Sequence, residues 1–406
     1  MREGWSSTAL KNVCTVDKAK HSGTTLPYVG LEHIESGTGK FIGSLAPATA
    51  KSTTFSFTAG HVLYGRLRPY LNKVLLPEFD GHCSSEIFPL RVESSLDRRF
   101  LYYWLTWEPV VKEIDSTSTG ARMPRANINK LLEFEIPLPS FSEQKRIVAI
   151  LDEAFAGIAT AVANTEKNLA NARELFESYL NSVFSQRGES WARKPLETLV
   201  HDTCTLSYGI VQPGPDVTDG LPVVRPTDLR EKFIRRDTLK TIDPSLAKAY
   251  SRTTLHGGDL LLCVRGTTGV VSIAATELEG ANVTRGIVPI RFNPDLLGQE
   301  LGYYLLRSPV VQEQISAKTY GAALMQINIR DVRKLLIPVP SRKIHEELRG
   351  SLDDLSVEAG RLQSIYRQKL NALSELKQSL LQKAFSGELT ADKEVSNAIH
   401  NKEEVA

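Results

Sequence analysis

The segment YGRLRPYLNK concentrates side chains that bind nucleic acid. Arg66, Arg68 and Lys73 supply three cations, Tyr64 and Tyr70 supply two aromatic rings, and no acidic residue interrupts them. Such cations contact phosphates and base edges, and aromatic rings stack on bases or support the loop that carries the cations. The same composition also fits a solvated loop that follows a strand, with its tyrosines packed inwards. The rest of the chain favours the first interpretation.

A second basic cluster lies in TGARMPRAN, where Arg122 and Arg125 precede an expected helix. An arginine that binds guanine through two hydrogen bonds contributes about 1–3 kcal/mol of discrimination between bases. A contact to phosphate adds affinity without sequence information, and it weakens as the salt concentration rises. We expect these arginines to bind DNA, and the sequence leaves open which of them contact bases.

Catalytic motifs are not visible in the sequence. It contains no G-x-G-x-x-G and no N/D-P-P motif that ends in an aromatic residue, so methyl transfer by this chain is not expected. The four cysteines, Cys14, Cys83, Cys204 and Cys263, are far apart and form no C-x-x-C pair. This spacing favours buried, reduced thiols over a zinc site or a disulfide framework. We therefore expect a binding protein without catalytic, cofactor-binding or metal-binding residues.

Composition and charge set further bounds. Of the 406 residues 41% are apolar, and the net charge is +2. Such a chain can build real cores, and if it binds DNA it must gather its basic residues on one face. The sequence contains no run of 18 apolar residues, so a membrane span is not predicted. The segment MREGWSSTALKNV lacks the apolar core of a signal peptide. We expect a cytoplasmic protein.

The two halves of the chain repeat each other. TGARMPRANINKLLEFEIPLPS (119–140) aligns with YGAALMQINIRDVRKLLIPVPS (320–341) at a constant offset of 201 positions. Asn127 thereby meets Asn328, and because the two residues are identical we expect a backbone or capping role for both, in preference to base recognition. Each half consists of a globular region of roughly 140 residues followed by a long helix.

The second half of the chain contains segments that align with those of the first half, but their side chains differ. GHVLYGRLR (60–68) corresponds to GDLLLCVRG (258–266), so Gly266 replaces Arg68 and we expect this half to bind a different target. The candidate DNA-binding residues of the second half are Arg265, Thr267 and Thr268 in and just after this segment, with Tyr208, Arg225, Arg285 and Gln326 elsewhere.

Two long stretches predict helices. Residues 142–185 contain no proline and a single glycine, and apolar or small residues recur there in steps of four and three. This heptad seam comprises Ile158, Val162, Thr165, Leu169, Ala172, Phe176, Tyr179 and Val183, and residues 343–385 repeat it. Each helix spans roughly 65 Å. An antiparallel coiled coil of the two helices is the simplest arrangement that buries both seams; two helices that each pack on their own domain are the alternative.

These patterns predict a mixed α/β (α+β) fold with a pseudo-twofold internal repeat. Its parts are a first globular domain at 1–140, a long helix at 141–188, a second globular domain at 189–341, a second long helix at 342–388 and a flexible tail at 389–406. Ser140 and Ser341 are the expected N-caps of the helices, and Gly387 is the expected C-cap of the second.

The order of these parts resembles the specificity (S) subunit of type I restriction-modification systems. The phrases that carry the resemblance are PYVGLEHIE (27–35), LYGRLRPYLNKV (63–74), IPLPSFSEQKRIVAILD (136–152), PVVRPTDL (222–229), IPVPS (337–341) and LLQKAFSGELT (380–390). The resemblance implies two target recognition domains that each read one half of a bipartite site in double-stranded DNA. It also implies that the helices act as a ruler for the unread spacer.

The resemblance further implies partners. The subunit would have no catalysis and no cofactor of its own. It would recruit two methyltransferase subunits, which bind S-adenosylmethionine and methylate adenine, and two restriction (motor-nuclease) subunits in the full complex. A two-headed coiled-coil protein adaptor without DNA specificity is the alternative, and it predicts binding that is insensitive to nucleic acid. The basic segment without acidic residues favours the DNA-binding subunit.

Overall fold

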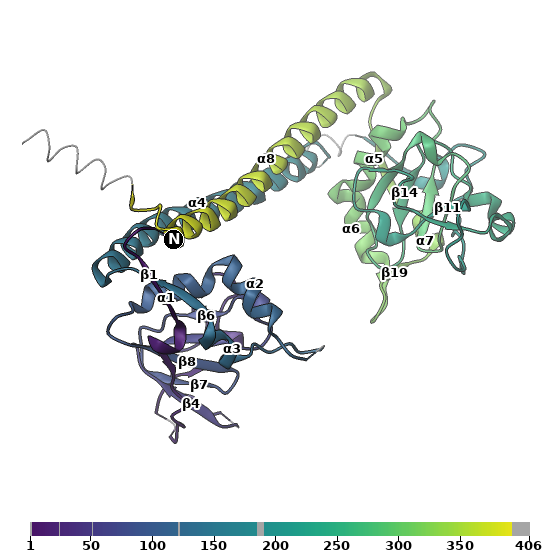
Figure 1. Cartoon of the computed structure of the whole chain (residues 1–406). Helices are drawn as coiled ribbons and strands as arrows, with labels where there is room; N and C mark the ends of the chain where they lie inside the picture. The colour runs from purple at the N-terminus through teal and green to yellow at the C-terminus, as the bar shows by residue number, and fades with distance from the viewer. Residues whose placement is uncertain (1, 24, 51, 121, 185–190, 392–406) are drawn as a thin grey trace, which may run out of the picture. The chain divides into compact units, whose positions relative to one another are not determined.

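The computed structural model describes residues 2–391 except 24, 51, 121 and 185–190, and the chain divides into two compact units (Figure 1). Unit 1 comprises Met1–Glu166 and Arg367–Ala406, and unit 2 comprises Lys167–Tyr366. Each unit therefore holds one globular region and a part of each long helix. The boundaries predicted for the recognition domains divide the chain differently and stay predictions. The predicted end of the first helix and most of the tail lie outside the described residues.

The globular region of unit 1 combines small sheets with short helices. Its strands are β1 (Ser6–Ala9), β2 (Cys14–Val16), β3 (Tyr28–Val29), β4 (Thr54–Phe57), β5 (Val62–Gly65), β6 (Val74–Leu75), β7 (Gly81–Ser84), β8 (Ile87–Val92) and β9 (Glu135–Leu138). Its short helices are α1 (Arg98–Thr106), α2 (Glu108–Ser116) and α3 (Ile128–Glu133). One sheet has the order β2-β8-β5-β6, another has the order β3-β7-β4, and β1 pairs with β9.

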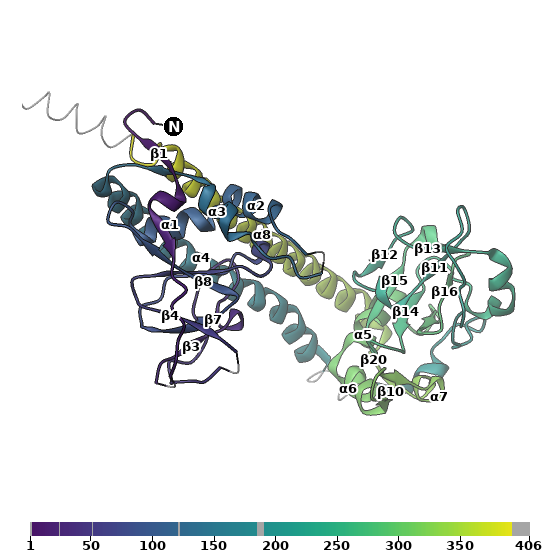
Figure 2. The same cartoon turned by 60° about the horizontal axis from the view of Figure 1, so that its bottom comes forward.

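The globular region of unit 2 repeats this plan with additional strands (Figure 2). Its strands are β10 (Ala192–Pro195), β11 (Leu221–Val224), β12 (Phe233–Ile234), β13 (Lys240–Ile242), β14 (Leu260–Cys263), β15 (Val271–Ala274), β16 (Asn282–Val283), β17 (Ile287–Ile290), β18 (Thr319–Tyr320), β19 (Gln326–Ile327) and β20 (Leu336–Val339). Its short helices are α5 (Gln299–Arg307), α6 (Pro309–Lys318) and α7 (Ile329–Arg333). The long helices are α4 (Phe141–Ser182) and α8 (His345–Ser386).

Strand pairing confirms the internal repeat. The strand before each long helix pairs antiparallel with the first strand of its own half, β9 with β1 and β20 with β10. The central antiparallel pair β5–β8 matches β14–β17, and the parallel pair β3–β7 matches β11–β16. The predicted mixed α/β fold is therefore confirmed, and the repeat extends to the way in which the strands are connected.

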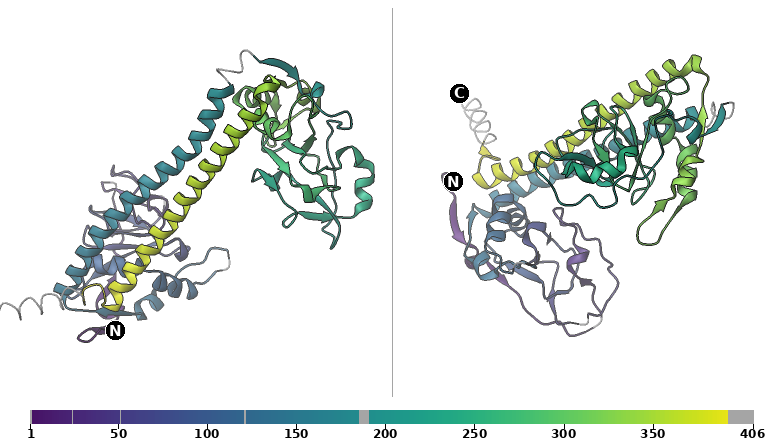
Figure 3. Two further views of the ribbon diagram at one scale, coloured as in Figure 1. Left: turned by 90° about the horizontal axis from the view of Figure 1, so that it is seen from above. Right: turned by 90° about the vertical axis from the view of Figure 1, so that its right-hand side faces the viewer.

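In unit 1 the first part of α4 and the last part of α8 lie side by side and antiparallel (Figure 3). Near the start of α4, Glu143 accepts a hydrogen bond from Thr390, which lies just beyond the end of α8. Further along α4, the ring of Phe155 lies 5.3 Å from the ammonium group of Lys377, within α8. In unit 1 the two helices therefore run in opposite directions.

Both helices enter the cores of the globular regions. In unit 1, Leu151 of α4 and Leu381 of α8 are fully buried against α1. In unit 2, Leu180 of α4 and Leu352 of α8 are fully buried against α5. Among the helices that the structure describes, α4 is long and apolar enough to cross a membrane by length and composition alone. Leu151 and Leu180 of the same helix are packed in the two cores.

The predicted caps have different outcomes. Asn127 caps α3 and Asn328 caps α7, each accepting backbone N–H bonds from the first turn, so the capping prediction is confirmed. The hydroxyl of Ser140 accepts an N–H bond from the first turn of α4 at 3.3 Å. Ser341 makes no such bond, because a short 3-10 turn separates it from α8. Gly387 ends α8 with φ of +86°, a left-handed conformation that glycine adopts without strain.

Candidate nucleic-acid interface

In unit 1 the two basic clusters of the sequence meet at the end of strand β5. Arg68 donates its backbone N–H to the carbonyl of Pro124 at 2.7 Å, and Ala126 donates to the carbonyl of Arg66 at 2.8 Å. These bonds tie the loop after β5 to the segment before α3, although the two are far apart in the chain. Clusters that the sequence predicted separately thus form one surface.

A carboxylate from a third segment holds two of these arginines. Arg125 donates to Glu86 from Nε at 3.1 Å and from a terminal guanidinium nitrogen at 3.0 Å, and these hydrogen bonds raise the pKa of Arg125. Arg66 Nε lies 3.7 Å from the same carboxylate, and its guanidinium group lies over the ring of Phe88. Both guanidinium groups remain partly exposed, so Glu86 orients them and leaves donors available to a ligand.

The other predicted residues of unit 1 have different environments. Arg68, Tyr70 and Arg122 are exposed. Tyr64 is only 3% exposed, and burial raises its pKa, so its ring supports the surface from beneath and offers no face to a base. Lys73 donates to the carbonyl of Leu31 at 2.7 Å, a bond that fastens the loop. Only part of the predicted cluster is therefore free to meet DNA.

Unit 2 repeats the arrangement at the end of β14. Gly266 donates its backbone N–H to the carbonyl of Met325 at 2.8 Å, and Ile327 donates to the carbonyl of Val264 at 3.0 Å. Arg265 and Gln326 face each other across these two segments. The loop after β14 is thus held against the β18–β19 hairpin, as the loop after β5 is held against the segment before α3.

A groove of about 900 Å³ opens beside this loop. Its lining includes four predicted residues, Arg225, Arg265, Thr267 and Arg285, together with apolar side chains such as Ile210, Val211 and Leu324. The fold thereby gathers predicted residues from three separate segments. Arg265 Nε is buried and has no hydrogen-bond partner among the described residues, so a ligand that supplies an acceptor there would satisfy it.

The arginines that line this groove are held to different degrees. Arg225 donates to Asp228 from Nε at 3.1 Å and from a terminal nitrogen at 2.9 Å, and these hydrogen bonds raise its pKa. Arg285 is exposed. A carboxylate thus orients an arginine in each unit, although Glu86 and Asp228 come from unrelated positions of the repeat.

Three predicted residues of unit 2 lie outside the groove. The Tyr208 hydroxyl accepts the N–H of Ile329 at 2.7 Å and donates to the carbonyl of Ile327, a backbone-supporting role. Thr268 lines a separate cleft beside the long helices. Gln326 belongs to strand β19, where its backbone pairs with β18. DNA contact by these three residues stays a prediction, and the hydrogen bonds of Tyr208 give it a structural role.

Exposed apolar side chains beside the arginines were missed from the sequence. Met123 and Leu324 occupy equivalent positions of the repeat, and each is 47% exposed. In unit 2, Tyr320 and Met325 at the same hairpin are also exposed. Apolar groups at such a surface can contact thymine methyl groups or wedge between bases. The signal was present in the alignment, where a large apolar residue follows Gly120 and Gly321 by three positions in both halves.

Metal-ligand clusters and cysteine chemistry can be judged for the described part of the chain. No group of three or more His, Cys, Asp and Glu side chains among the described residues could hold a metal ion. The four cysteines are free, and burial raises the pKa of Cys14 and of Cys83 to about 12, so these thiols stay protonated. The arrangement is suited to binding, through arginines, backbone groups and apolar side chains.

These features define a duplicated binding protein with two basic surfaces and a pair of long helices, and the comparisons with known proteins narrow the class. Residues 2–169 match the family model of the type I restriction modification DNA specificity domain. The chain is 23% identical to the type I restriction enzyme EcoBI specificity subunit of Escherichia coli over 327 residues, which are 75% of this chain and 68% of that subunit. It is 29% identical to the EcoDI specificity subunit of Escherichia coli over 194 residues, 47% of this chain and 43% of that subunit.

A solved structure shares the fold. The chain superposes with a TM-score of 0.78 on a chain from a study of complex assembly and conformational transition in a type I restriction-modification system. The two are 21% identical, and the match covers 96% of this chain and 99% of the other. Residues 2–169 belong to the family of the type I restriction modification DNA specificity domain, and the chain is similar along most of its length to type I specificity subunits, which in general are not catalytic. The resemblance seen in the sequence is thereby confirmed.

Proposed function

We propose that the chain is the DNA sequence-recognition subunit of a type I restriction-modification complex, and that the globular region of each unit recognises one half of a bipartite site. The repeated frame carries the proposal. In both units a loop that follows a central strand is hydrogen-bonded to the segment before a capped helix, and an arginine lies in each loop. Because the frame is repeated while its side chains differ, the two halves of the site would differ in sequence.

The arginines would have different roles in DNA binding, some contacting bases and others contacting phosphates. Arg66 and Arg125 in unit 1 and Arg225 in unit 2 lie against carboxylates. A guanidinium group held in one orientation can present a fixed pair of donors to guanine, which suits base recognition. The exposed Arg68 and Arg285 suit phosphate contacts, which tolerate movement and give affinity that falls with salt.

The long helices would set the unread spacer and bind the methyltransferase subunits. Leu175 of α4 and Leu376 of α8 occupy equivalent positions of the repeat, and they are 49% and 47% exposed. Exposed leucines at matching positions would give two copies of one partner the same contact. In this proposal the methyltransferase subunits bind S-adenosylmethionine and methylate adenine, and two restriction subunits complete the complex.

The docking proposal has a direct test. Leu175→Asp and Leu376→Asp each place a charge at one of the two contacts, so each variant should retain one methyltransferase copy, and the double variant none. Native mass spectrometry of the reconstituted complex counts the copies, and Val357→Asp, another exposed apolar position of α8, is the control. Full occupancy in the double variant would exclude these leucines as the docking sites.

The recognition proposal is tested by methylome sequencing of cells that express the chain with its methyltransferase. We expect a single bipartite motif with methylated adenine. The double variant Arg66→Ala, Arg68→Ala should relax one half of that motif, with a loss of about 1–3 kcal/mol of discrimination if a guanine contact is removed. Arg91→Ala, an exposed arginine at the other end of β8 from Glu86, should leave the motif unchanged.

Two outcomes would contradict the proposal. Equal loss of both half-sites in a folded double variant would mean that the units do not recognise separate halves. Partner binding that is insensitive to DNA, with no methylated motif, would favour the protein adaptor.

A further inference from the structure

In unit 2 a lysine, a tyrosine and an aspartate join three elements of the fold. Lys232 lies in the loop before β12, Tyr304 lies on α5 and Asp353 lies on α8. Lys232 Nζ donates to Asp353 Oδ1 at 2.9 Å and to Tyr304 Oη at 3.0 Å. Tyr304 Oη donates to the same carboxylate oxygen at 2.6 Å. We call these three residues the clasp.

The clasp is an ion pair reinforced by a hydroxyl group. Burial raises the pKa of Tyr304, and the hydrogen bond to Asp353 raises it further, so the hydroxyl remains a donor. Burial by itself would raise the pKa of Asp353, but the hydrogen bonds from Tyr304 and Lys232, together with the charges of Lys232 and Arg349, outweigh it and leave that pKa lowered. The carboxylate is therefore charged at neutral pH, and it accepts bonds of fixed direction from two different elements.

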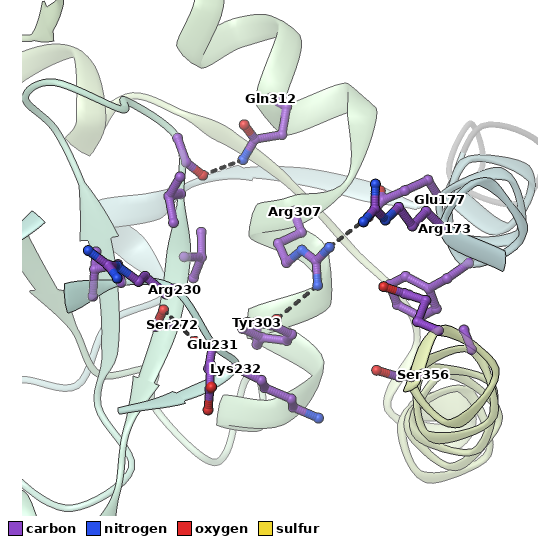
Figure 4. Close-up of a pocket in the computed structure, with 18 of the residues that line it drawn as sticks. Arg173, Glu177, Arg230, Glu231, Lys232, Ser272, Tyr303, Arg307, Gln312 and Ser356 are labelled. Atoms are coloured by element: carbon purple, nitrogen blue, oxygen red, sulfur yellow. Dashed lines mark hydrogen bonds and ion pairs between the residues drawn. The ribbon is translucent and has the colours of Figure 1, made fainter. Parts of the chain in front are cut away.

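Beside the clasp, a cleft of about 680 Å³ lies between the globular region and the long helices of unit 2 (Figure 4). Its walls include Glu231 and Lys232 from the loop and Glu177 from α4. Arg307 of α5 ties one wall to the other through its ion pair with Glu177 at 2.6 Å. The short helix α5 packs on the long helices through an apolar core, whereas the loop is joined to α8 across this cleft through Lys232.

Unit 1 fastens its corresponding loop by a different route. Lys377 of α8 donates to the carbonyl of Gly37 at 3.3 Å. When LPYVGLEHIESG is aligned with LPVVRPTDLREK, Gly37 stands opposite Lys232. The lysine therefore comes from the helix in unit 1 and from the loop in unit 2. In both units this loop is hydrogen-bonded to α8, although different residues form the bond. This indicates that the contact itself is required.

We propose that the clasp is a positioning device that fixes the angle at which the globular region of unit 2 stands on its own helices, and that Lys232 thereby restricts the spacer length accepted by the subunit. This inference rests on the proposed function, because a spacer exists only if the units recognise a bipartite site. The clasp residues do not line the arginine groove. Their loss should therefore leave the preferred bases of the half-site intact.

The first test is methylome sequencing of cells that express the complete complex with Lys232→Met or Asp353→Asn. The preference for the native spacer over spacers one base pair shorter or longer should fall about tenfold, because a charge-assisted bond is lost at a point of support. Lys232→Arg keeps the positive charge opposite Asp353, which Arg349 of α8 also contacts at 3.3 Å, and should retain the preference. Lys248→Met, at an exposed lysine of the same unit, is the control.

Several results would overturn the proposal. A spacer preference that is unchanged in both single variants would show that the clasp does not set it. Altered half-site bases, or complete loss of methylation by variants whose thermal unfolding is normal, would show that the clasp acts on base recognition or assembly instead.

A measurement on the purified subunit separates this inference from the proposed function. Spin labels at Asp237→Cys in the globular region and Ser364→Cys in α8 report a distance within unit 2, in a Cys204→Ser background. Lys232→Met should broaden the distance distribution, and Lys232→Arg, which keeps the charge, should leave it narrow. An unchanged distribution would overturn the clasp as a restraint. A broadened distribution, with no bipartite motif in the wild-type methylome, would keep the restraint and overturn its role in DNA recognition.

Discussion

Units 1 and 2 hold different side chains on one backbone frame. In unit 1 Arg68 adopts a left-handed conformation with φ of +52°, and in unit 2 Gly266 adopts the same region with φ of +88° at the equivalent position. The carbonyl of Glu86 accepts the N–H of Arg66 as that of Gly286 accepts the N–H of Val264. The frame depends on backbone groups, so the side chains that meet a target can change without loss of the fold.

The contacts between the globular regions and the long helices include one hydrogen bond that is the same in both units and packing that differs between them. Tyr103 donates to Asp152 in unit 1 as Tyr304 donates to Asp353 in unit 2. The preceding tyrosine packs on this ring in both units, whereas a further aromatic ring comes from Phe155 of α4 in unit 1 and from Phe176 of α4, at an unrelated repeat position, in unit 2. The comparison indicates that the hydrogen bond is needed in both units and that the packing around it is adjustable.

The largest expected effect tests whether the units are stabilised separately. Phe385 in unit 1 and Phe184 in unit 2 occupy equivalent positions and are almost fully buried. Phe385→Ala or Phe184→Ala should cost about 3–5 kcal/mol of unfolding free energy, because each leaves a cavity in a packed core. Hydrogen exchange read by mass spectrometry should show lost protection in the affected unit only. Val357→Ala, at an exposed position, is the control. Equal loss of protection in both units would show that they unfold together.

A smaller effect sharpens the comparison of the two surfaces. Glu86→Gln removes the charge that orients Arg66 and Arg125, and the equivalent Gly286 offers no side chain to remove. Discrimination at one half-site should fall by about 1–3 kcal/mol while non-specific DNA binding tightens, because one negative charge is lost.

Competition binding at several salt concentrations measures both quantities. Glu93→Gln, at an exposed position of the same unit, is the control that changes the charge equally. A loss of non-specific affinity in Glu86→Gln would contradict the assigned role of the carboxylate.

The smallest effect concerns acid stability. The lowered pKa of Asp353 means that its contribution is complete above the unfolded-state pKa, about 4, and is lost as the pH falls through the lower folded-state value. Asp353→Asn should therefore reduce the acid sensitivity of unit 2 relative to the wild type. Acid titration followed by hydrogen exchange in peptides of unit 2 checks this, with peptides of unit 1 as the internal reference. An unchanged acid profile would mean that the carboxylate does not couple folding to pH.

The helices were predictable because apolar or small residues recur periodically in the sequence. Thr165 and Ala172 of the predicted seam are almost fully buried. Tyr179 was also placed in the seam, but it is 37% exposed, and its neighbour Leu180 is fully buried instead. Toward its end α4 packs against the core of unit 2 as well as against α8, so a different face is covered there. A heptad pattern describes packing against a helix and does not describe packing against a globular core.

The binding surfaces were predictable only in part. The segment YGRLRPYLNK contains cations and no acidic residue, yet strand pairing between β5 and β8 brings Glu86 to Arg66. Tyr208 was proposed for DNA contact, but its hydroxyl is hydrogen-bonded to the backbone groups of Ile327 and Ile329 at the start of α7. Partners that arrive through strand register are invisible to a local pattern.

The sequence by itself determined the repeat, the long helices and the supply of arginines, because residue type, spacing and periodic burial are local properties of a chain. Only the tertiary structure decided which arginines a carboxylate holds, that Tyr64 is buried, and that Lys232 reaches Asp353. Those outcomes depend on side-chain contacts between elements that are far apart in sequence, and the free energy of a charge or a hydroxyl is set by the partner it meets there.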